Sequence, residues 1–451
     1  MSVHLACRGK EQRILRSKSK IKEDNIRSFI IAASFSCVYL FPVTKMVPMK
    51  FALLFLCLAA FCSPVKRIVI TDTAVINGPI KTGAEQTELY VPYLKGKRVA
   101  MMANQTTIIG KKHLVDSLQK MGVKIVKVFG PEHGFRGNKS AGESLDDETD
   151  SATGIPLISL YGKKNKPSKE DLADVDVLVY DLQDVGVRFY TNINALSRLM
   201  EACFENGKEL LILDRPNPNA YLIDGPILDM KYKSGIGMFP IPMSHGLTVA
   251  EFAQMANGEG WLANKVKCKL RIVKVANYNH DMPYTLPVKP SPNLNSQQSI
   301  MLYPSTCMFE GVYINHGRGT YSPFAVLGSP EYKGIYSFSF KPTGIKGMAE
   351  TPIFMDTVCY GLDLRNYDVA LLRKSKQINL QWIMELYKAH PHKEKFFEHL
   401  SNQMNSIEIQ VGSGEFRKQI INGVSEKDIR ASWEPGLSQY KEMRKKYLLY
   451  E

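Results

Sequence analysis

Apolar runs that alternate with amphipathic segments between residues 96 and 219 constrain the fold of this chain most strongly. Near-continuous Val/Ile/Leu strands joined by helices are typical of a parallel sheet covered on both faces. We therefore predict an α/β fold, with a Rossmann-like parallel sheet domain followed by a second, smaller α+β domain. The predicted strands are 96–107, 123–134, 155–162, 174–186 and 208–219, and the predicted helices are 111–122 and 191–207.

The first 63 residues are predicted to be a leader. The segment MKFALLFLCLAAFCS, which begins at Met49, has a basic residue, an apolar core and small residues near its end, as a secretory signal does. The true start is then Met46 or Met49, and the mature chain is periplasmic or secreted. The alternative is that the apolar run 29–41 belongs to a membrane anchor, although it is shorter than the roughly 20 residues that a spanning helix needs.

The predicted domains are 64–229, a Rossmann-like domain expected to be catalytic, and 230–451, an α+β domain expected to complete a ligand-binding cleft with it. In the second part, Thr248 and Glu251 have the spacing of a capping box and predict a helix start. Residues 268–278 and 335–342 predict strands, and 381–390 predicts a helix. The final segment, 426–450, is interpreted as paired helices.

The charge distribution argues against a nucleic-acid partner. Residues 1–63 carry 10 Lys/Arg and 3 Asp/Glu, so half of the formal charge of +14 lies in the leader. The remainder has mixed charges and no basic stripe interleaved with aromatic residues.

No nucleotide cofactor and no metal is expected. The turn after the first predicted strand is NQTTIIGKK rather than a glycine-rich phosphate loop, and no Walker sequence is present. The histidines lack the paired spacing of a zinc site. The four cysteines outside the leader, Cys203, Cys268, Cys307 and Cys359, are expected to be buried free thiols.

Polar side chains follow each predicted strand at the point where it ends. Ligands of open parallel sheets bind at the carboxyl ends of the strands, where the loops converge. Several consecutive strands that end in acids, amides, guanidinium groups and hydroxyls therefore predict one cleft for a hydroxyl-rich ligand, although a turn or cap role is as frequent for any single residue. These side chains are Asn104, Glu132, His133, Tyr161, Asp181, Gln183, Asp184, Arg188, Tyr190, Asp214, Arg215 and Asn217.

Seven motifs in a fixed order carry a resemblance to a known family. They are ANQT, FGPEHGFRG, DLQDVGVRFYT, LDRPNPN, SHGLT, MFEG and GRGT. Together, over residues 80–451, the chain resembles the exo-β-N-acetylmuramidases of glycoside hydrolase family 171. The resemblance implies a secreted or periplasmic enzyme that removes terminal β-N-acetylmuramic acid from the non-reducing ends of peptidoglycan fragments, in a cleft between a Rossmann-like domain and a smaller α+β domain.

Glu132 is the candidate general acid under this resemblance. Glycoside hydrolysis requires a proton donor for the leaving oxygen, and burial in a closed cleft raises a carboxyl pKa toward neutral pH. The alternative for Glu132 is a capping or ion-paired glutamate. His133 is a candidate to orient Glu132 or bind the acetamido group, and Glu310 is the candidate partner carboxylate from the second domain.

Arg188 is the first candidate to pair with the lactyl carboxylate of the substrate, because a guanidinium binds a carboxylate in a bidentate manner. An internal salt bridge to Asp184 or Asp214 is the alternative. Arg318 is the second candidate for the carboxylate. The remaining predicted substrate-binding residues are Asn104, Gln183, Asp184, Tyr190, Asp214, Arg215, Asn217 and His245.

The stereochemistry of hydrolysis stays open between retaining, inverting and substrate-assisted routes, because it depends on a distance between carboxyl groups that the sequence does not contain. Two other classes of protein also stay open. One is a non-catalytic muropeptide-binding protein, and the other is a different cell-wall enzyme, such as a deacetylase or an esterase.

Overall fold

A computed structural model describes residues 68–70, 78–131, 134–135, 148–162, 164–398 and 405–450 of the chain. The predicted leader and the pair Glu132 and His133 lie outside the described residues. Within the part that is described, no helix is long and apolar enough to cross a bilayer.

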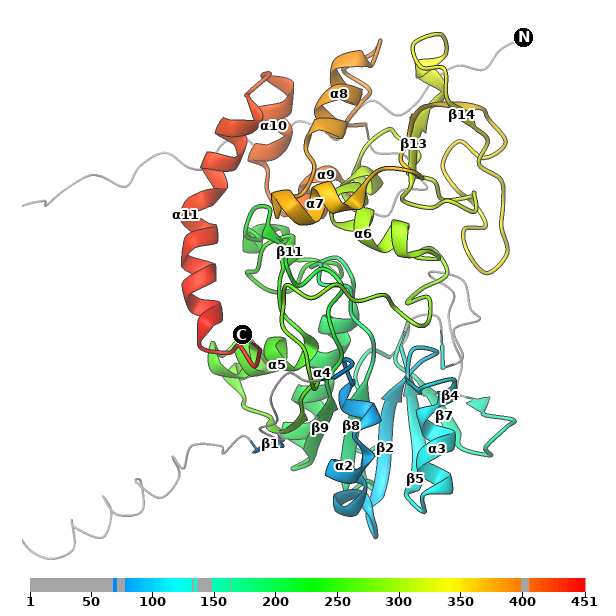
Figure 1. Cartoon of the computed structure of the whole chain (residues 1–451), viewed down its shortest axis with the longest axis vertical. Helices are drawn as coiled ribbons and strands as arrows, with labels where there is room; N and C mark the ends of the chain where they lie inside the picture. The colour runs from blue at the N-terminus through cyan, green and yellow to red at the C-terminus, as the bar shows by residue number, and fades with distance from the viewer. Residues whose placement is uncertain are drawn as a thin grey trace, which may run out of the picture. The chain divides into compact units, whose positions relative to one another are not determined.

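The described residues form a sheet of eight strands in the order β1-β12-β9-β8-β2-β5-β7-β6 (Figure 1). Seven of these strands run parallel, and the two-residue edge strand β6 runs antiparallel to β7. The predicted parallel sheet is therefore confirmed. The strands are β1 (Ile68–Ile70), β2 (Arg98–Ala103), β5 (Lys124–Gly130), β6 (Glu148–Thr149), β7 (Pro156–Ser159), β8 (Val177–Asp181), β9 (Glu209–Leu213) and β12 (Lys269–Val273).

Both faces of this sheet are buried. Successive side chains of a strand point to opposite faces, so neighbouring residues of one strand pack into different cores. In β2, Val99 and Met101 pack into the core that includes α2 (Thr87–Leu94) and α3 (Leu114–Lys120). Ala100 and Met102 pack into the core on the other face, with α4 (Asn192–Glu205) and α5 (Val249–Gly258). The central strands β2, β8 and β9 carry runs of apolar residues that face both sides, which is the physical reason for this two-sided burial.

The large sheet extends beyond the domain boundary predicted near residue 230. β12 pairs with β9 and β1 and contributes Leu270 and Ile272 to the core. The segment between β9 and α5 contains only the short pair β10 (Ile223–Asp224) and β11 (Ser244–His245) among its described strands. That long irregular excursion makes the sequence change character before the sheet is complete.

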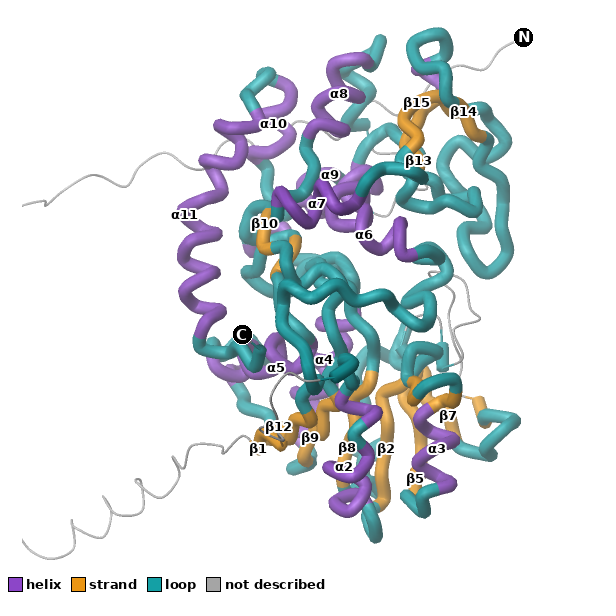
Figure 2. Tube along the Cα trace, in the orientation of Figure 1, coloured by secondary structure: helices purple, strands orange, loops and turns teal. Residues whose placement is uncertain are grey.

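The second domain, from α6 to α11, contains a small antiparallel sheet in the order β13-β15-β14 and several short helices (Figure 2). This mixture of helices and antiparallel strands is the α+β type that the sequence predicts. The elements are α6 (Gln297–Thr306), β13 (Val326–Ser329), β14 (Ser339–Phe340), β15 (Cys359–Asp363), α7 (Val369–Ser375), α8 (Gln381–Ala389), α9 (Ile407–Val411), α10 (Glu415–Ile421) and α11 (Glu426–Lys445).

Short elements complete the described chain. A hairpin of two short strands, each of two residues, follows β2, and short 3-10 helices connect the longer elements. These are β3 (Ile108–Ile109), β4 (Lys112–His113), η1 (Gly83–Glu85), η2 (Met230–Tyr232), η3 (Ala263–Lys265), η4 (Cys307–Gly311) and η5 (Pro330–Tyr332).

The C-terminal segment is one helix, α11, and the prediction of paired helices is wrong. Pro435 and Gly436 lie inside the helix, where both are unfavourable in isolation. Tertiary packing outweighs this cost, because Trp433 and Leu437 lie in the core of the second domain and Tyr440 lies in the core of the sheet domain. The helix thus runs from one core to the other, as Figure 1 shows.

Candidate active site

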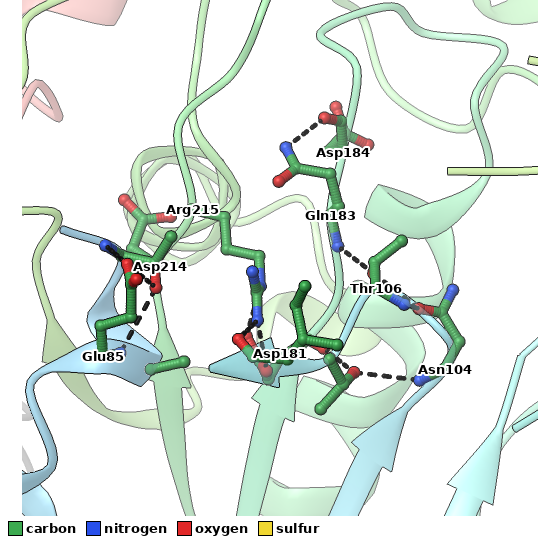
Figure 3. Close-up of polar contacts among 12 residues, drawn as sticks. Glu85, Asn104, Thr106, Asp181, Gln183, Asp184, Asp214 and Arg215 are labelled. Carbon is green, nitrogen blue, oxygen red and sulfur yellow. Dashed lines mark hydrogen bonds and ion pairs between the residues drawn. The ribbon is translucent and has the colours of Figure 1, made fainter. Parts of the chain in front are cut away.

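The carboxyl ends of β2, β8 and β9 meet at one edge of the sheet, and Figure 3 shows the polar side chains that follow them. Asn104 follows β2, Asp181 ends β8, and Asp214 follows β9. The parallel pairing of these strands places residues from three separate parts of the sequence next to one another. This edge is the candidate site that the strand ends predict.

Pro131 and Gly134, which flank the undescribed pair Glu132 and His133 in the sequence, follow β5 at the same edge. On either side of the two undescribed residues, the Gly134 N–H donates to the Pro131 carbonyl at 3.0 Å, and Gly134 has φ +74°. Glycine adopts this left-handed conformation without a steric penalty. Beyond it, the buried Phe135 ring contacts the His113 ring edge-on, with centroids 4.6 Å apart. The flanking residues of the predicted acid are therefore well anchored.

Asn104 is a buried strand-end residue, 3% exposed, whose side-chain oxygen is held by the protein. Its Oδ1 accepts hydrogen bonds from the backbone N–H and the hydroxyl of Thr106, at 2.9 and 2.6 Å. Within the described part of the chain, its Nδ2 donates to no acceptor. The side chain is thus fixed through its oxygen and retains two N–H donors.

Gln183 uses its amide to connect two strand-end loops. Its Nε2 donates to the carbonyls of Asp184 and Pro216, at 2.8 and 2.7 Å. The predicted contact with substrate is therefore limited to its Oε1. Tyr190 is similarly engaged, because its hydroxyl donates to the Pro290 carbonyl at 2.8 Å.

The LDRPNPN residues hold the loop after β9 rather than face an open cleft. Arg215 donates from Nε and Nη2 to the two carboxylate oxygens of Asp181, at 2.6 and 2.8 Å, and both side chains are buried. Asn217 donates to the Leu247 carbonyl at 3.0 Å and accepts from the Asn219 N–H at 2.8 Å. The structure does not support the prediction that these side chains bind sugar hydroxyls, because Arg215 and Asn217 are both buried and most of their polar atoms bind protein groups.

Asp214 is an internal carboxyl group at the start of α5. It accepts from the Ala250 N–H at 3.1 Å and from the Tyr450 hydroxyl. Burial raises the pKa of Asp214 to about 7, although hydrogen bonds from Tyr450 and Thr248 oppose that effect. Asp214 therefore stabilises the start of a helix, and its predicted role in substrate binding is not supported.

Asp184 and His245 form a second internal pair. Asp184 accepts from the Gly186 N–H at 2.7 Å, and its carboxylate oxygen lies 3.8 Å from His245 Nε2. Burial raises the pKa of Asp184 to about 7. Burial, followed by the Arg444 and Arg188 charges, lowers the pKa of His245 to about 3. His245 is therefore neutral, and both side chains are inaccessible to a saccharide.

Arg188 is engaged by the protein itself. Its guanidinium is 1% exposed and donates to backbone carbonyls on two sides. Nη1 donates to Pro226 and Ile241, at 3.1 and 2.9 Å, and Nη2 donates to Val411 at 2.6 Å. Backbone carbonyls take these donors, and among the described residues Arg188 forms no salt bridge to Asp184 or Asp214.

The second domain supplies a charged cluster around Glu310, which follows α6 in η4. Arg318 donates from Nε and Nη2 to Glu310 Oε1, at 3.0 and 2.6 Å, and its Nε also lies 3.1 Å from His316 Nε2. Burial alone would raise the pKa of Glu310, but the Arg318 charge and the His316 and Arg318 hydrogen bonds hold the pKa well below its usual range. Glu310 is therefore an ionised carboxylate.

This cluster is partly accessible, with side-chain exposures of 20% for Glu310 and 27% for Arg318. Arg318 Nη1 contacts no acceptor in the described part of the chain. Two residues that contact Glu310 or Arg318 were not predicted from the sequence. His316 directly precedes the GRGT motif. Gln410, which donates to Glu310 Oε2 at 2.9 Å, lies 100 residues away in the sequence and belongs to no motif.

The cysteines, the metal-ligating residue types and the cavity in the described part of the chain do not indicate another active site. The four cysteines outside the predicted leader are free and buried, as predicted. No group of three or more His, Cys, Asp or Glu within the described ranges has a geometry that could hold a metal ion. A cavity of about 460 Å³ beside α3 contains none of the predicted site residues. Its lining residues are Gln105, Ile108, Lys111, Lys112, His113, Asp116, Ser117 and Lys120.

The fold and the site define a class: a two-domain α/β protein with polar loops at the carboxyl ends of parallel strands and a charged cluster in the second domain. Residues 99–298 match the family model for the N-terminal part of the exo-β-N-acetylmuramidase NamZ, and residues 301–450 match the model for its C-terminal part. The chain belongs to this family, and it is a glycoside hydrolase. The junction of the two matches also lies downstream of the predicted boundary near residue 230.

Individual relatives agree with the family match. The chain is 37% identical over 377 residues to the peptidoglycan β-N-acetylmuramidase NamZ of Bacillus subtilis (strain 168), which covers 80% of this chain and 89% of the relative. A crystal structure of a DUF1343 family protein from Bacteroides fragilis NCTC 9343 has a TM-score of 0.76 at 43% identity, covering 83% of this chain and 99% of that one. A second protein with this description, from the same organism, has a TM-score of 0.69 at 29% identity, covering 82% and 99%.

Proposed function

We propose that this chain hydrolyses the bond to terminal, non-reducing β-N-acetylmuramic acid in peptidoglycan fragments. The observation that carries the proposal is the match of both domains to one exo-β-N-acetylmuramidase family, together with a polar sheet edge whose loops carry the family motifs. The relative from Bacillus subtilis is named for the same activity on peptidoglycan.

Glu132 is the proposed general acid. The internal contacts of Asp181, Asp184 and Asp214 remove three strand-end carboxyl groups from consideration, because each is buried and bound by protein donors. Glu132 follows β5 in the sequence, and the described residues Pro131 and Gly134 on either side of the Glu132–His133 pair lie at the carboxyl end of that strand. A carboxyl group that burial keeps protonated donates a proton to the leaving oxygen.

Glu310 is the proposed partner carboxylate. The reaction develops positive charge at the anomeric centre, so the second group must be negatively charged. Glu310 is ionised and partly exposed, which suits charge stabilisation rather than proton donation. Its charge is shared with Arg318, which limits its basicity.

Arg318 is the proposed recognition group for the lactyl carboxylate. With Arg188 engaged internally, Arg318 is the guanidinium of the two candidates that retains exposure and an unused Nη1. A guanidinium already paired with one carboxylate can still donate through its other edge, because it has five N–H donors in a fixed plane.

The proposed localisation is periplasmic or secreted, with residues 1–63 as a leader that is removed. The apolar segment from Met49 supports this, because it has the layout of a secretory signal. Mass spectrometry of the mature N-terminus after expression in a Gram-negative host tests it. A chain that retains residues 1–63 and stays in the cytoplasm would contradict it.

The test of function is release of a chromogenic phenol from β-linked N-acetylmuramic acid and from β-linked N-acetylglucosamine by residues 64–451. We expect turnover of the muramic substrate to be at least about 100-fold faster in kcat/KM, since an ion pair with the lactyl group contributes about 3 kcal/mol. Arg318→Gln should reduce this ratio.

Three other results would contradict the proposed activity or its substrate. Equal turnover of both sugars would contradict recognition of the lactyl group. Binding of muropeptides without turnover would indicate a receptor. Release of acetate without phenol, abolished by a chelator, would indicate a metal-dependent deacetylase.

A further inference from the structure

We propose that Gln410 is a positioning residue that fixes the orientation of Glu310, and that Arg188 anchors Gln410 to the sheet domain. The inference rests on the proposed role of Glu310 at the active site. It assigns functions to two buried residues, one of which, Arg188, has no role in substrate binding.

Gln410 contacts Glu310 directly from α9. Its Nε2 donates to Glu310 Oε2 and to the Cys307 carbonyl, both at 2.9 Å, and the residue is 1% exposed. Because both partners are acceptors, only the amide nitrogen fits on this side, and the orientation of the amide is determined. Arg318 holds the other carboxylate oxygen, Oε1, so both oxygens of Glu310 are fixed by the protein.

The contact depends on a close approach of α9 to η4. A Cβ at Gly311, the last residue of η4, would lie 2.6 Å from the Ile407 backbone nitrogen at the start of α9. Real Cβ atoms do not approach backbone so closely, so any larger residue would separate the two elements. Gly311 therefore allows Gln410 to reach Glu310.

Arg188 holds the other end of α9. Its Nη2 donates to the Val411 carbonyl at 2.6 Å and lies 3.4 Å from the Gln410 carbonyl. Gly412, with φ +75°, follows directly, and a Cβ there would lie 2.6 Å from Arg188 Nη2. Through Nη1, Arg188 is bound to carbonyls of the sheet domain, so it joins α9 to the domain that carries the strand-end loops.

The result is a continuous chain of hydrogen bonds from Arg188 through Gln410 to Glu310 and Arg318. Catalytic groups work when their side chains are held in one orientation by buried neighbours. Here the neighbours belong to the interface between the domains. The position of the partner carboxylate thus follows from how the two domains are docked.

The experiment is a double-mutant cycle of Gln410→Met and Glu310→Gln, measured with the chromogenic muramic substrate. Methionine has nearly the same length as glutamine and lacks the donor. We expect Gln410→Met to lower kcat about tenfold and to change KM less than about twofold, since a hydrogen bond to a charged group is lost in a buried site. In the Glu310→Gln background, Gln410→Met should have no further effect on kcat.

The matched control is Gln419→Met, because Gln419 donates to Ser432 on the exposed side of α10, and its kcat should equal that of the parent protein. Wild-type kcat in Gln410→Met, or an equal loss in both backgrounds, would overturn the inference while leaving the role of Glu310 intact. Full activity of Glu310→Gln would instead overturn the proposed role of Glu310 and this inference with it. Urea unfolding of each variant distinguishes a folding defect from loss of position.

Discussion

Buried polar side chains at the strand ends use most of their hydrogen-bonding atoms inside the protein. Arg188 and Arg215 are the clearest cases, because a guanidinium at a strand end suggested substrate recognition, whereas both bind protein acceptors. Their positions at the ends of predicted strands correctly indicated that they lie at the carboxyl end of the sheet. Their partners could not be predicted, because Val411 is 223 residues from Arg188 along the chain.

Two buried carboxyl groups should make the stability of the protein depend on pH. The folded-state pKa values of Asp184 and Asp214 are about 7, above the ordinary value of 3.8. Between these pH values the folded state binds more protons than the unfolded state, so the free energy of unfolding falls as pH rises. Acidification should therefore stabilise the fold in this range, until other carboxylates protonate.

Asp184→Asn should reduce this pH dependence. Asparagine keeps an acceptor for the Gly186 N–H and removes the ionisation. We expect the decrease in unfolding free energy from pH 5 to pH 8 to be smaller in the variant by on the order of 2 kcal/mol, as followed by urea titration at several pH values. The exposed Asp356→Asn serves as the control, and identical slopes in Asp184→Asn and the parent protein would refute the prediction.

Elements were predicted well where their own residues determine them. Thr248 and Glu251 form the capping box that their spacing indicates, with the Glu251 N–H 3.3 Å from Thr248 Oγ1 and the Thr248 N–H 2.9 Å from Glu251 Oε2. α11 was not predicted as one helix, because Pro435 and Gly436 are local signals for a break. Long-range packing against two cores decided its conformation, and such packing has no signature within the segment itself.

The end of α11 and the residues after it fasten the chain to the sheet domain. The Tyr440 hydroxyl donates to the His245 carbonyl at 2.7 Å, and Leu449 N–H donates to Glu251 at 2.8 Å. The buried Tyr450 hydroxyl donates to the Asp214 carboxylate and accepts from the Val275 N–H at 2.9 Å. The residues that follow the helix thus bind the residue after β9, Asp214, and the start of α5.

Tyr450→Phe should destabilise the protein by about 2 kcal/mol, because it leaves one oxygen of the buried Asp214 carboxyl group and the Val275 backbone N–H without their partner. The measurement is the midpoint of urea unfolding, with an unchanged m-value. Tyr321→Phe, at a residue that is 79% exposed, should leave the midpoint unchanged. An unaltered midpoint in Tyr450→Phe would show that the C-terminal contact contributes nothing to stability.

At the scale of the whole molecule, the sequence predicted the parallel sheet and the α+β character of the second domain, because apolar periodicity reflects burial directly. It did not predict that β12 completes the sheet, since that strand follows a long irregular excursion. The cluster around Glu310 was predicted only through motifs. Gln410 was missed, because its function arises from a contact between domains that no local pattern encodes.

The central claim is that Glu132 donates the proton during release of terminal muramic acid. The most direct test compares Glu132→Gln with the parent protein on a substrate with a good phenol leaving group and on a disaccharide with a sugar leaving group. Loss of a general acid costs about 100-fold or more where the leaving group needs protonation, and much less where it does not. We therefore predict a large loss on the disaccharide and a small loss on the activated phenol. Equal losses on both substrates, or full activity on the disaccharide, would contradict the account.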